Sequence, residues 1–98
     1  MILYIDATNY NKAVFALKNG KVFVKTYTID PRHVHQLTAC LEKFFKAGHI
    51  KINQLNKVVV NKGPGSFTGV RISVAIAQAL HLAWGIPFQV LSKSVFQI

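Results

Sequence analysis

Apolar positions in the first third of the chain follow strand-like patterns. Residues 1–6 form a run that is apolar on both faces, which is typical of a central strand covered by helices. Residues 12–18 alternate between apolar and polar positions and predict a second strand. Asn19-Gly20 then predicts a type I′ turn into a third strand over residues 21–29. The pattern therefore predicts three successive antiparallel strands.

A helix is predicted after these strands. Asp30-Pro31 supplies an N-cap and a proline at the first helical position, and Gly48 ends the helix. Its apolar stripe consists of Val34, Leu37, Leu41, Phe44 and Phe45. A short connector follows, in which Ile50, Ile52 and Leu55 are expected to cover an edge of the sheet.

The second half of the chain predicts a strand, a helix and a last strand. Residues 57–61 form a continuous apolar run, expected to lie parallel to the first strand. A helix runs from about residue 66 to 84, Gly85-Ile86-Pro87 ends it, and residues 88–91 form a fifth strand.

Right-handed crossovers then determine the topology of the sheet. The simplest strand order is 3-2-1-4-5, in an α/β arrangement of the ribonuclease H-like half of actin and hexokinase-type (ASKHA) folds. A single domain of this kind is expected over residues 1–98.

The turn from the fourth strand into the last helix contains the glycines on which this arrangement depends. Gly63 and Gly65 can adopt positive φ or admit another backbone, and Pro64 fixes φ between them. Ser66 or Thr68 can cap the helix with a side-chain oxygen. We call Gly63, Pro64, Gly65, Ser66 and Thr68 the elbow and predict a structural role for it.

A phosphate could also bind the free N–H groups at such a helix start. The glycines, however, follow G-x-G-x-x-x-G, one residue off the dinucleotide fingerprint, and no Gly-Lys-Ser/Thr follows as in a P-loop. A structural elbow is therefore favoured over nucleotide binding, and no cofactor is expected.

The helix after the elbow is apolar over a wide arc. Arg71 and Gln78 mark one narrow polar strip. The apolar positions around the rest of the helix are Ile72, Ala75, Ile76, Ala79, Leu80 and Ala83. Small residues four apart continue this surface at Gly69, Ser73 and Ala77.

Such an arc indicates burial on more than one side, whereas a sheet covers only one. A helix-to-helix interface is therefore predicted, with the small residues closest to the partner helix. Its predicted residues are Gly69, Ile72, Ser73, Ile76, Ala77 and Leu80. The alternative is that the two helices of this domain bury each other on the same face of the sheet.

Charge and composition bound the possible partners. Twelve Lys and Arg stand against three acids, a net charge of +9, which favours contact with RNA or an acidic protein surface. The basic residues form no run and no RNP-like motif, so a basic solvated surface is favoured over a dedicated RNA-binding module. A single cysteine, the lack of a leader pattern and the lack of an apolar segment of spanning length predict a cytoplasmic protein without a membrane anchor.

The sequence lacks the sets of carboxylates and histidines that several kinds of catalysis require. A ribonuclease H-type nuclease needs several carboxylates around two metal ions, but Asp6 ends a strand, Asp30 reads as a helix cap and Glu42 lies mid-helix. Asp6 is instead expected to bond backbone in the loop after the first strand. His33 and His35 are two apart, whereas helical metal pairs use i+3 or i+4. No catalytic residue and no metal site are therefore expected.

Nucleotide hydrolysis of the actin or hexokinase kind needs a second lobe, because the phosphates are held in the cleft between two lobes. The segment Asp6-Ala7-Thr8 resembles the start of the phosphate loop in that superfamily. It lacks the glycine that lets backbone approach a phosphate.

The run Gly-Pro-Gly-Ser-Phe-Thr-Gly-Val-Arg-Ile over residues 63–72 resembles the signature of the TsaB (YeaZ) family, bacterial partner proteins in making threonylcarbamoyladenosine on transfer RNA. The companion segments appear in family order at Asp6-Ala7-Thr8, Asn19-Gly20, Pro31-Arg32-His33 and Trp84-Gly85-Ile86-Pro87. The resemblance covers nearly the whole chain, and Lys93-Ser94-Val95-Phe96 resembles the family's entry into its next helix. It departs at Ala7, usually Thr, at Ser73, usually Gly, and in the missing C-terminal domain of the family.

The resemblance implies the ribonuclease H-like fold and a non-catalytic scaffold that supports a TsaD-like enzyme in threonylcarbamoyl transfer to tRNA adenosine. It implies pairing through the two helices with the TsaD-like subunit, or as a homodimer when alone. A TsaE-like ATPase in a larger complex and indirect tRNA contact are further expectations.

Two alternatives stay open. One is half of a nucleotide-binding ASKHA enzyme completed by another chain, and the other is a small basic RNA-binding module. Heat stabilisation by ATP would favour the first, and a steep salt dependence of tRNA binding would favour the second.

Overall fold

The computed structural model describes residues 1–92, and its five strands form one mixed sheet in the order β3-β2-β1-β4-β5. β1 pairs in parallel with β4, and β4 with β5, whereas β2 is antiparallel to both β1 and β3. The strands are β1 (Ile2–Asp6), β2 (Lys12–Asn19), β3 (Lys21–Thr28), β4 (Lys57–Asn61) and β5 (Phe88–Leu91). The predicted order of the sheet is confirmed.

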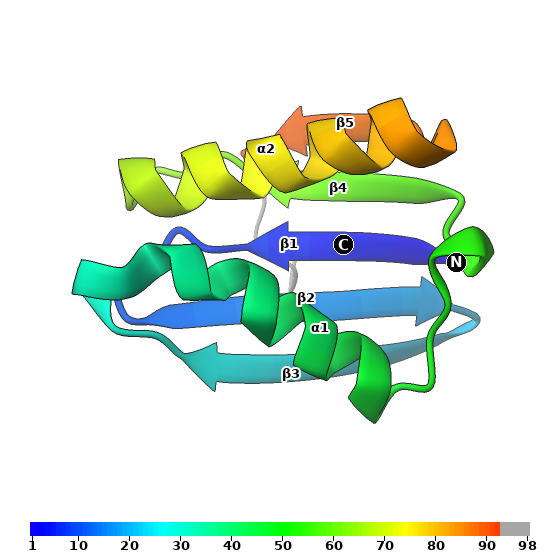
Figure 1. Cartoon of the computed structure of the whole chain (residues 1–98), viewed down its shortest axis with the longest axis horizontal. Helices are drawn as coiled ribbons and strands as arrows, with labels where there is room; N and C mark the ends of the chain where they lie inside the picture. The colour runs from blue at the N-terminus through cyan, green and yellow to red at the C-terminus, as the bar shows by residue number, and fades with distance from the viewer. Residues whose placement is uncertain (93–98) are drawn as a thin grey trace.

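Both α-helices lie on one face of the sheet, as Figure 1 shows. Helix α1 (Leu37–Ala47) crosses β2 and β3, and helix α2 (Phe67–Trp84) lies along β4 and β5. Two short 3₁₀ segments, η1 (Pro31–Gln36) and η2 (Ile52–Gln54), precede α1 and β4. None of the helices within residues 1–92 is both long and apolar enough to cross a bilayer.

The first helix begins later than the sequence predicted. Asp30-Pro31 opens η1 rather than an α-helix, and the backbone of His33 is non-helical, with φ −133° and ψ 50°. The carboxylate of Asp30 accepts the N–H of Arg32 at 2.9 Å, which closes a tight local turn in place of a helical first turn. The prediction of Pro31 at the first position of a long α-helix is therefore wrong, and Gly48 ends α1 as predicted.

The β2–β3 hairpin is present, but its turn is not type I′. That turn needs positive φ at both central residues. Gly20 meets this requirement with φ 75°, but Asn19 does not have positive φ. The one non-glycine residue with positive φ in the described range is His49, which lies outside this turn. The last pair of the register is Asn19 with Lys21, so Gly20 is the single residue between the two strands instead of the two residues of a type I′ turn.

The core lies between the helices and the sheet and is centred on aromatic rings. Phe15 and Phe44 are fully buried with ring centroids 5.6 Å apart, and Phe23 stacks on Phe44 at 5.3 Å. Leu37 and Leu41 from the predicted stripe of α1 are also buried. The side chain of Val34 and the segment 93–96, both assigned roles from the sequence, lie outside what the structure describes.

Candidate protein interface

The elbow turns β4 into α2 through two glycines with positive φ. Gly63 has φ 106° and Gly65 has φ 155°. A Cβ on Gly65 would lie 2.3 Å from the carbonyl oxygen of Thr8, so a side chain there has no room. The N–H of Ser66 donates to that same oxygen at 2.8 Å, which ties the elbow to the loop after β1.

Ser66 is the residue that caps α2. Its Oγ accepts the N–H of Gly69 at 3.2 Å, while the other predicted cap, Thr68, is exposed in the first turn. At the other end Gly85, with φ 70°, gives α2 a left-handed C-cap, and its N–H donates to the carbonyl of His81.

Asp6 uses both of its carboxylate oxygens inside this loop cluster. Oδ1 accepts the N–H of Thr8 at 3.1 Å and its hydroxyl at 2.6 Å, and Oδ2 accepts the side-chain amide of Asn61 at 3.1 Å. The Oδ1 of Asn61 in turn accepts the N–H of Gly63 at 3.1 Å. The prediction that Asp6 bonds backbone after the first strand is confirmed, and its negative charge opposes a phosphate at this end of the sheet.

Three of the predicted interface residues face the sheet instead of a partner. Ser73 and Ala77 are completely buried, and Ser73 donates its hydroxyl to the carbonyl of Gly69 at 2.7 Å. A Cβ on Gly69 would lie 2.1 Å from the carbonyl oxygen of Ala7. The prediction that Gly69, Ser73 and Ala77 lie closest to a partner helix is therefore wrong, because these small residues let α2 approach the sheet.

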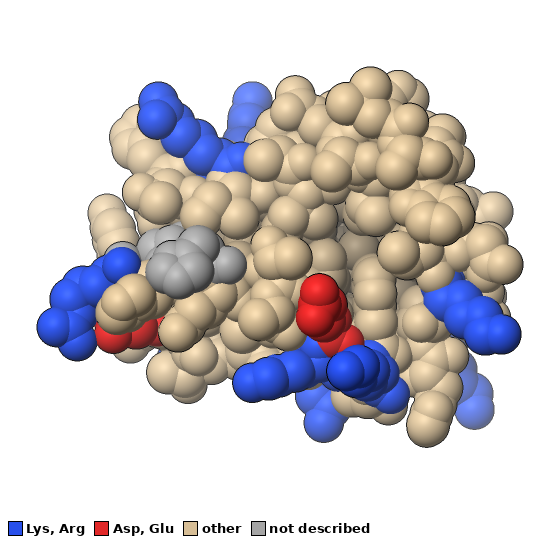
Figure 2. All heavy atoms as spheres, in the orientation of Figure 1, with Lys and Arg blue, Asp and Glu red and all other residues tan. Residues whose placement is uncertain are grey.

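A groove of about 460 Å³ separates α1 from α2 on the outer surface of the helical layer. The surface over α2 and between the two helices is largely uncharged in Figure 2. Nine of its ten residues belong to the two helices; the tenth, Ile52, comes from η2. The lining residues are Thr38, Leu41, Glu42, Phe45, Ile52, Ile72, Ala75, Ile76, Ala79 and Leu80.

The groove keeps part of the predicted interface and adds residues that the prediction omitted. Ile72, Ile76 and Leu80 line it and are half-buried, as an apolar contact surface requires. Ala75 and Ala79 are exposed and four residues apart, so α2 carries a second line of small residues, on its outer side. The sequence shows this spacing, but it does not show which line the sheet covers.

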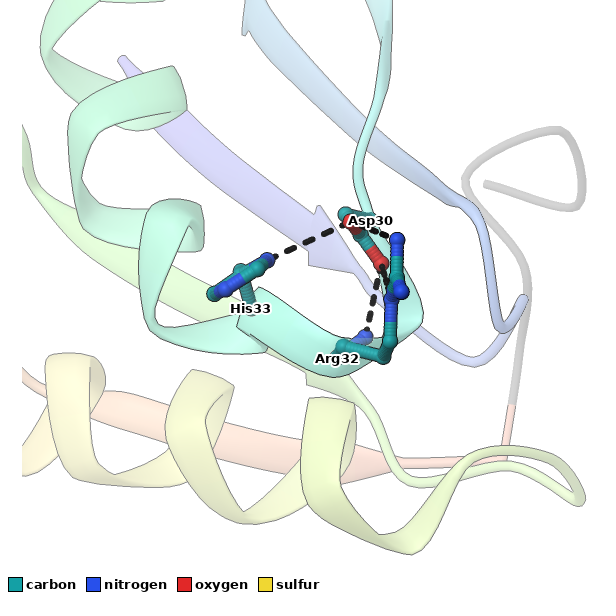
Figure 3. A network of polar contacts seen from close by, with 3 residues as sticks. All are labelled: Asp30, Arg32 and His33. Carbon is teal, nitrogen blue, oxygen red and sulfur yellow. Dashed lines mark hydrogen bonds and ion pairs between the residues drawn. The ribbon is translucent and has the colours of Figure 1, made fainter.

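A separate polar network surrounds Asp30 at the start of η1 (Figure 3). Its carboxylate accepts Nε and Nη2 of Arg32 at 3.2 Å each and lies 3.2 Å from Nδ1 of His33. The hydrogen bonds from Arg32, with a smaller contribution from His33, lower the pKa of Asp30 from its usual value of 3.8. This network stabilises a surface turn. Among the side chains that the structure describes, no three His, Cys, Asp or Glu gather as metal ligands would.

The sheet order, the two helices on one face and the elbow define an α/β domain of the actin and hexokinase (ASKHA) type. A family model described as "TsaD: tRNA N6-adenosine threonylcarbamoyltransferase" matches residues 27–94. The chain belongs to this family, and its likeness within it is to TsaB (YeaZ) proteins.

Two relatives named "tRNA threonylcarbamoyladenosine biosynthesis protein TsaB" illustrate that likeness. The protein of Buchnera aphidicola subsp. Schizaphis graminum is 33% identical over 89% of this chain, and that of Bacillus subtilis is 33% identical over 94%. The chain spans 41% of the length of each. The solved structure of YeaZ from Pseudomonas aeruginosa shares the fold, with a TM-score of 0.79 at 24% identity over 93% of this chain and 43% of that chain.

Proposed function

We propose that this chain is a non-catalytic subunit in the formation of threonylcarbamoyladenosine on tRNA, and that it supports a TsaD-like enzyme by pairing with it through the α1–α2 groove. The pathway is inferred from the names of the relatives. The mode of action is inferred from the α1–α2 groove. We further propose that residues 1–98 act as one ribonuclease H-like domain in the cytoplasm.

The observation that carries the proposal is the composition of the groove. Ala75 and Ala79 are small and exposed, so a partner helix can approach α2 closely, while Ile72, Ile76 and Phe45 offer apolar area at the sides. The family model matches a segment that includes both α1 and α2. A TsaD-like subunit therefore has a related pair of helices with which it can form a bundle with this pair.

The residues near the elbow support a non-catalytic role. Asp6 is held by Thr8 and Asn61, and both its oxygens already accept hydrogen bonds. Glu42 lies in the groove and Asp30 in the surface turn, so the three acids of the chain lie on separate elements. In this proposal the TsaD-like partner provides the metal and nucleotide chemistry.

Co-purification of the chain with a TsaD-like subunit from the same source tests the proposal. Ala79→Glu places a carboxylate in the groove and is expected to weaken pairing at least about tenfold, because an unpaired charge is buried on binding. Gln78→Glu is the matched control. It introduces the same charge at the residue directly before Ala79, which is exposed but does not line the groove.

Equal binding by the wild type and Ala79→Glu would place the contact elsewhere on the chain. A complete lack of binding by the wild type would overturn the proposed partnership. The same groove is proposed to receive a second copy when the TsaD-like subunit is absent, which light scattering at micromolar concentration would show as a dimer. A TsaE-like ATPase is proposed to join only the larger complex.

A further inference from the structure

A second groove lies at the end of the molecule that is opposite the elbow. It is about 390 Å³ in volume and lies between the β2–β3 turn and the loop that follows α1. Lys21, Phe23, Gly48 and Ile50 are among its lining residues. It shares no lining residue with the α1–α2 groove, so a partner seated on one does not directly occupy the other.

Four exposed lysines lie at this end of the molecule, and one of them lines the groove. Lys21 lines the groove. Lys18 pairs with Val22 just before the β2–β3 turn, and the alternation of side chains along β2 places it on the sheet face opposite Leu17, which lines the groove. Lys46 is in the last turn of α1, two residues before Gly48, and Lys51 follows Ile50. We call Lys18, Lys21, Lys46 and Lys51 the lysine end.

Two of the three acids lie at the end of the sheet opposite the lysine end, and the third lies on α1 one turn before Lys46. Asp6 ends β1 and Asp30 follows β3, both at the opposite end of the sheet. Glu42 lines the α1–α2 groove and forms no ion pair with Lys46 in the described structure. Figure 2 shows blue side chains and no red ones at the end where Figure 1 places the β2–β3 turn. None of the four lysines forms an ion pair within the described structure. The charges of these four lysines are therefore not neutralised by ion pairs and can meet an anionic partner.

We propose that the lysine end contacts the phosphate backbone of RNA. The choice of tRNA as that RNA rests on the proposed function, and the charge argument does not depend on it. Lysines spread over one end of a domain can neutralise several phosphates of a nucleic-acid backbone, which supplies sequence-independent affinity. The α1–α2 groove remains available for the protein partner, so both surfaces can act in one complex.

Fluorescence anisotropy with a labelled tRNA transcript tests this inference at several salt concentrations. The triple variant Lys21→Gln, Lys46→Gln and Lys51→Gln is expected to weaken binding by more than about tenfold at low salt, and to lower the slope of log affinity against log salt by about 2–3. The matched control is Lys12→Gln, Lys62→Gln and Arg71→Gln. This control also removes three positive charges, but from exposed residues at the elbow end of the molecule.

Three results would overturn the inference. Equal losses in the two triple variants would show that only net charge matters. If poly-glutamate of the same charge displaced the labelled tRNA as well as unlabelled tRNA does, the surface would be assigned to an acidic protein instead of RNA. Unchanged tRNA binding by a triple variant whose far-UV circular dichroism matches the wild type would exclude the lysine end, and the three single variants give the same test if the triple variant does not fold.

The outcome is separable from that of the proposed function. The lysine triple variant is expected to bind the TsaD-like subunit as well as the wild type does. If it does so but tRNA binding is unaffected, this inference fails alone. If the wild type binds tRNA through the lysine end but never binds the TsaD-like subunit, the proposed partnership fails and the RNA surface stands.

Discussion

Gly69 in the first turn of α2 and Ala7 in the loop after β1 are in direct contact, since a Cβ on Gly69 would lie 2.1 Å from the carbonyl oxygen of Ala7. The first turn of α2 therefore lies directly against the backbone that follows β1. The contact fixes which side of α2 faces the sheet, and it accounts for the burial of Ser73 and Ala77 one and two turns later.

Replacing Gly69 by alanine is therefore expected to destabilise the fold. Alanine would gain about 1 kcal/mol from helix propensity. Against this, the new methyl group meets backbone that cannot rotate away, and overpacking of this kind costs about 1–3 kcal/mol or more. We expect a net loss, measured as a lower midpoint of urea unfolding.

Gly48→Ala is the control for that experiment. A Cβ on Gly48 would meet the flexible Cδ1 of Ile50 at 2.6 Å, and this atom can shift. The loss is expected to be smaller than for Gly69→Ala, and the reverse ranking would contradict the proposed rigidity of the contact with Ala7.

Ala77 and Ala79 are expected to respond differently to the same substitution. Ala77 is fully buried in the core, so Ala77→Glu must bury an unpaired carboxylate or unfold the domain, at a cost of several kcal/mol. Ala79 is exposed, so Ala79→Glu is expected to leave the free energy of unfolding within about 0.5 kcal/mol of the wild type. Far-UV circular dichroism during denaturation separates the two, and a well-folded Ala77→Glu variant would refute the orientation of α2.

The cap of α2 is expected to depend on Ser66 alone. Ser66→Ala removes the acceptor for the N–H of Gly69 and should cost about 0.5–2 kcal/mol of folding stability. Thr68→Ala, at the exposed second position of the helix, should change stability by less than about 0.5 kcal/mol. Chemical denaturation of both variants measures the difference, and similar losses would mean that Thr68 shares the capping role.

Asp30 gives the chain an acid-dependent contribution to stability. Its pKa in the folded state is lowered below the usual 3.8, mainly by hydrogen bonds from Arg32, so the ionised carboxylate favours the folded state above that pH. This contribution is lost as the pH falls below 3.8 and passes through the folded-state pKa.

Asp30→Asn removes that contribution and should reduce the loss of thermal stability between about pH 5 and pH 2. The control is Glu42→Gln, because Glu42 has no hydrogen bond or ion pair within the described structure. Identical pH profiles for the wild type and Asp30→Asn would show that the Arg32 contacts do not persist in solution.

Local chemistry allowed much of this fold to be predicted from the sequence. The apolar runs of β1 and β4, the glycines of the elbow and Gly85 after α2 each act through neighbouring residues, and the structure contains all of them where they were expected. The strand order followed because only a few connections between such elements are allowed. Two local predictions failed, at the β2–β3 turn and at the start of α1, where the sequence permits more than one short hydrogen-bonded conformation.

The sequence alone shows that α2 is apolar over a wide arc and has small residues at four-residue spacing. It did not determine how α2 is rotated about its axis, because Gly69-Ser73-Ala77 and Ala75-Ala79-Ala83 have the same spacing and similar size. The packing of α2 on the sheet selects the first line, because Gly69 contacts the backbone of Ala7 and a side chain at that position would collide with it. Once the first line is buried on the sheet, the second is left on the outer surface beside α1, where a partner helix can reach it.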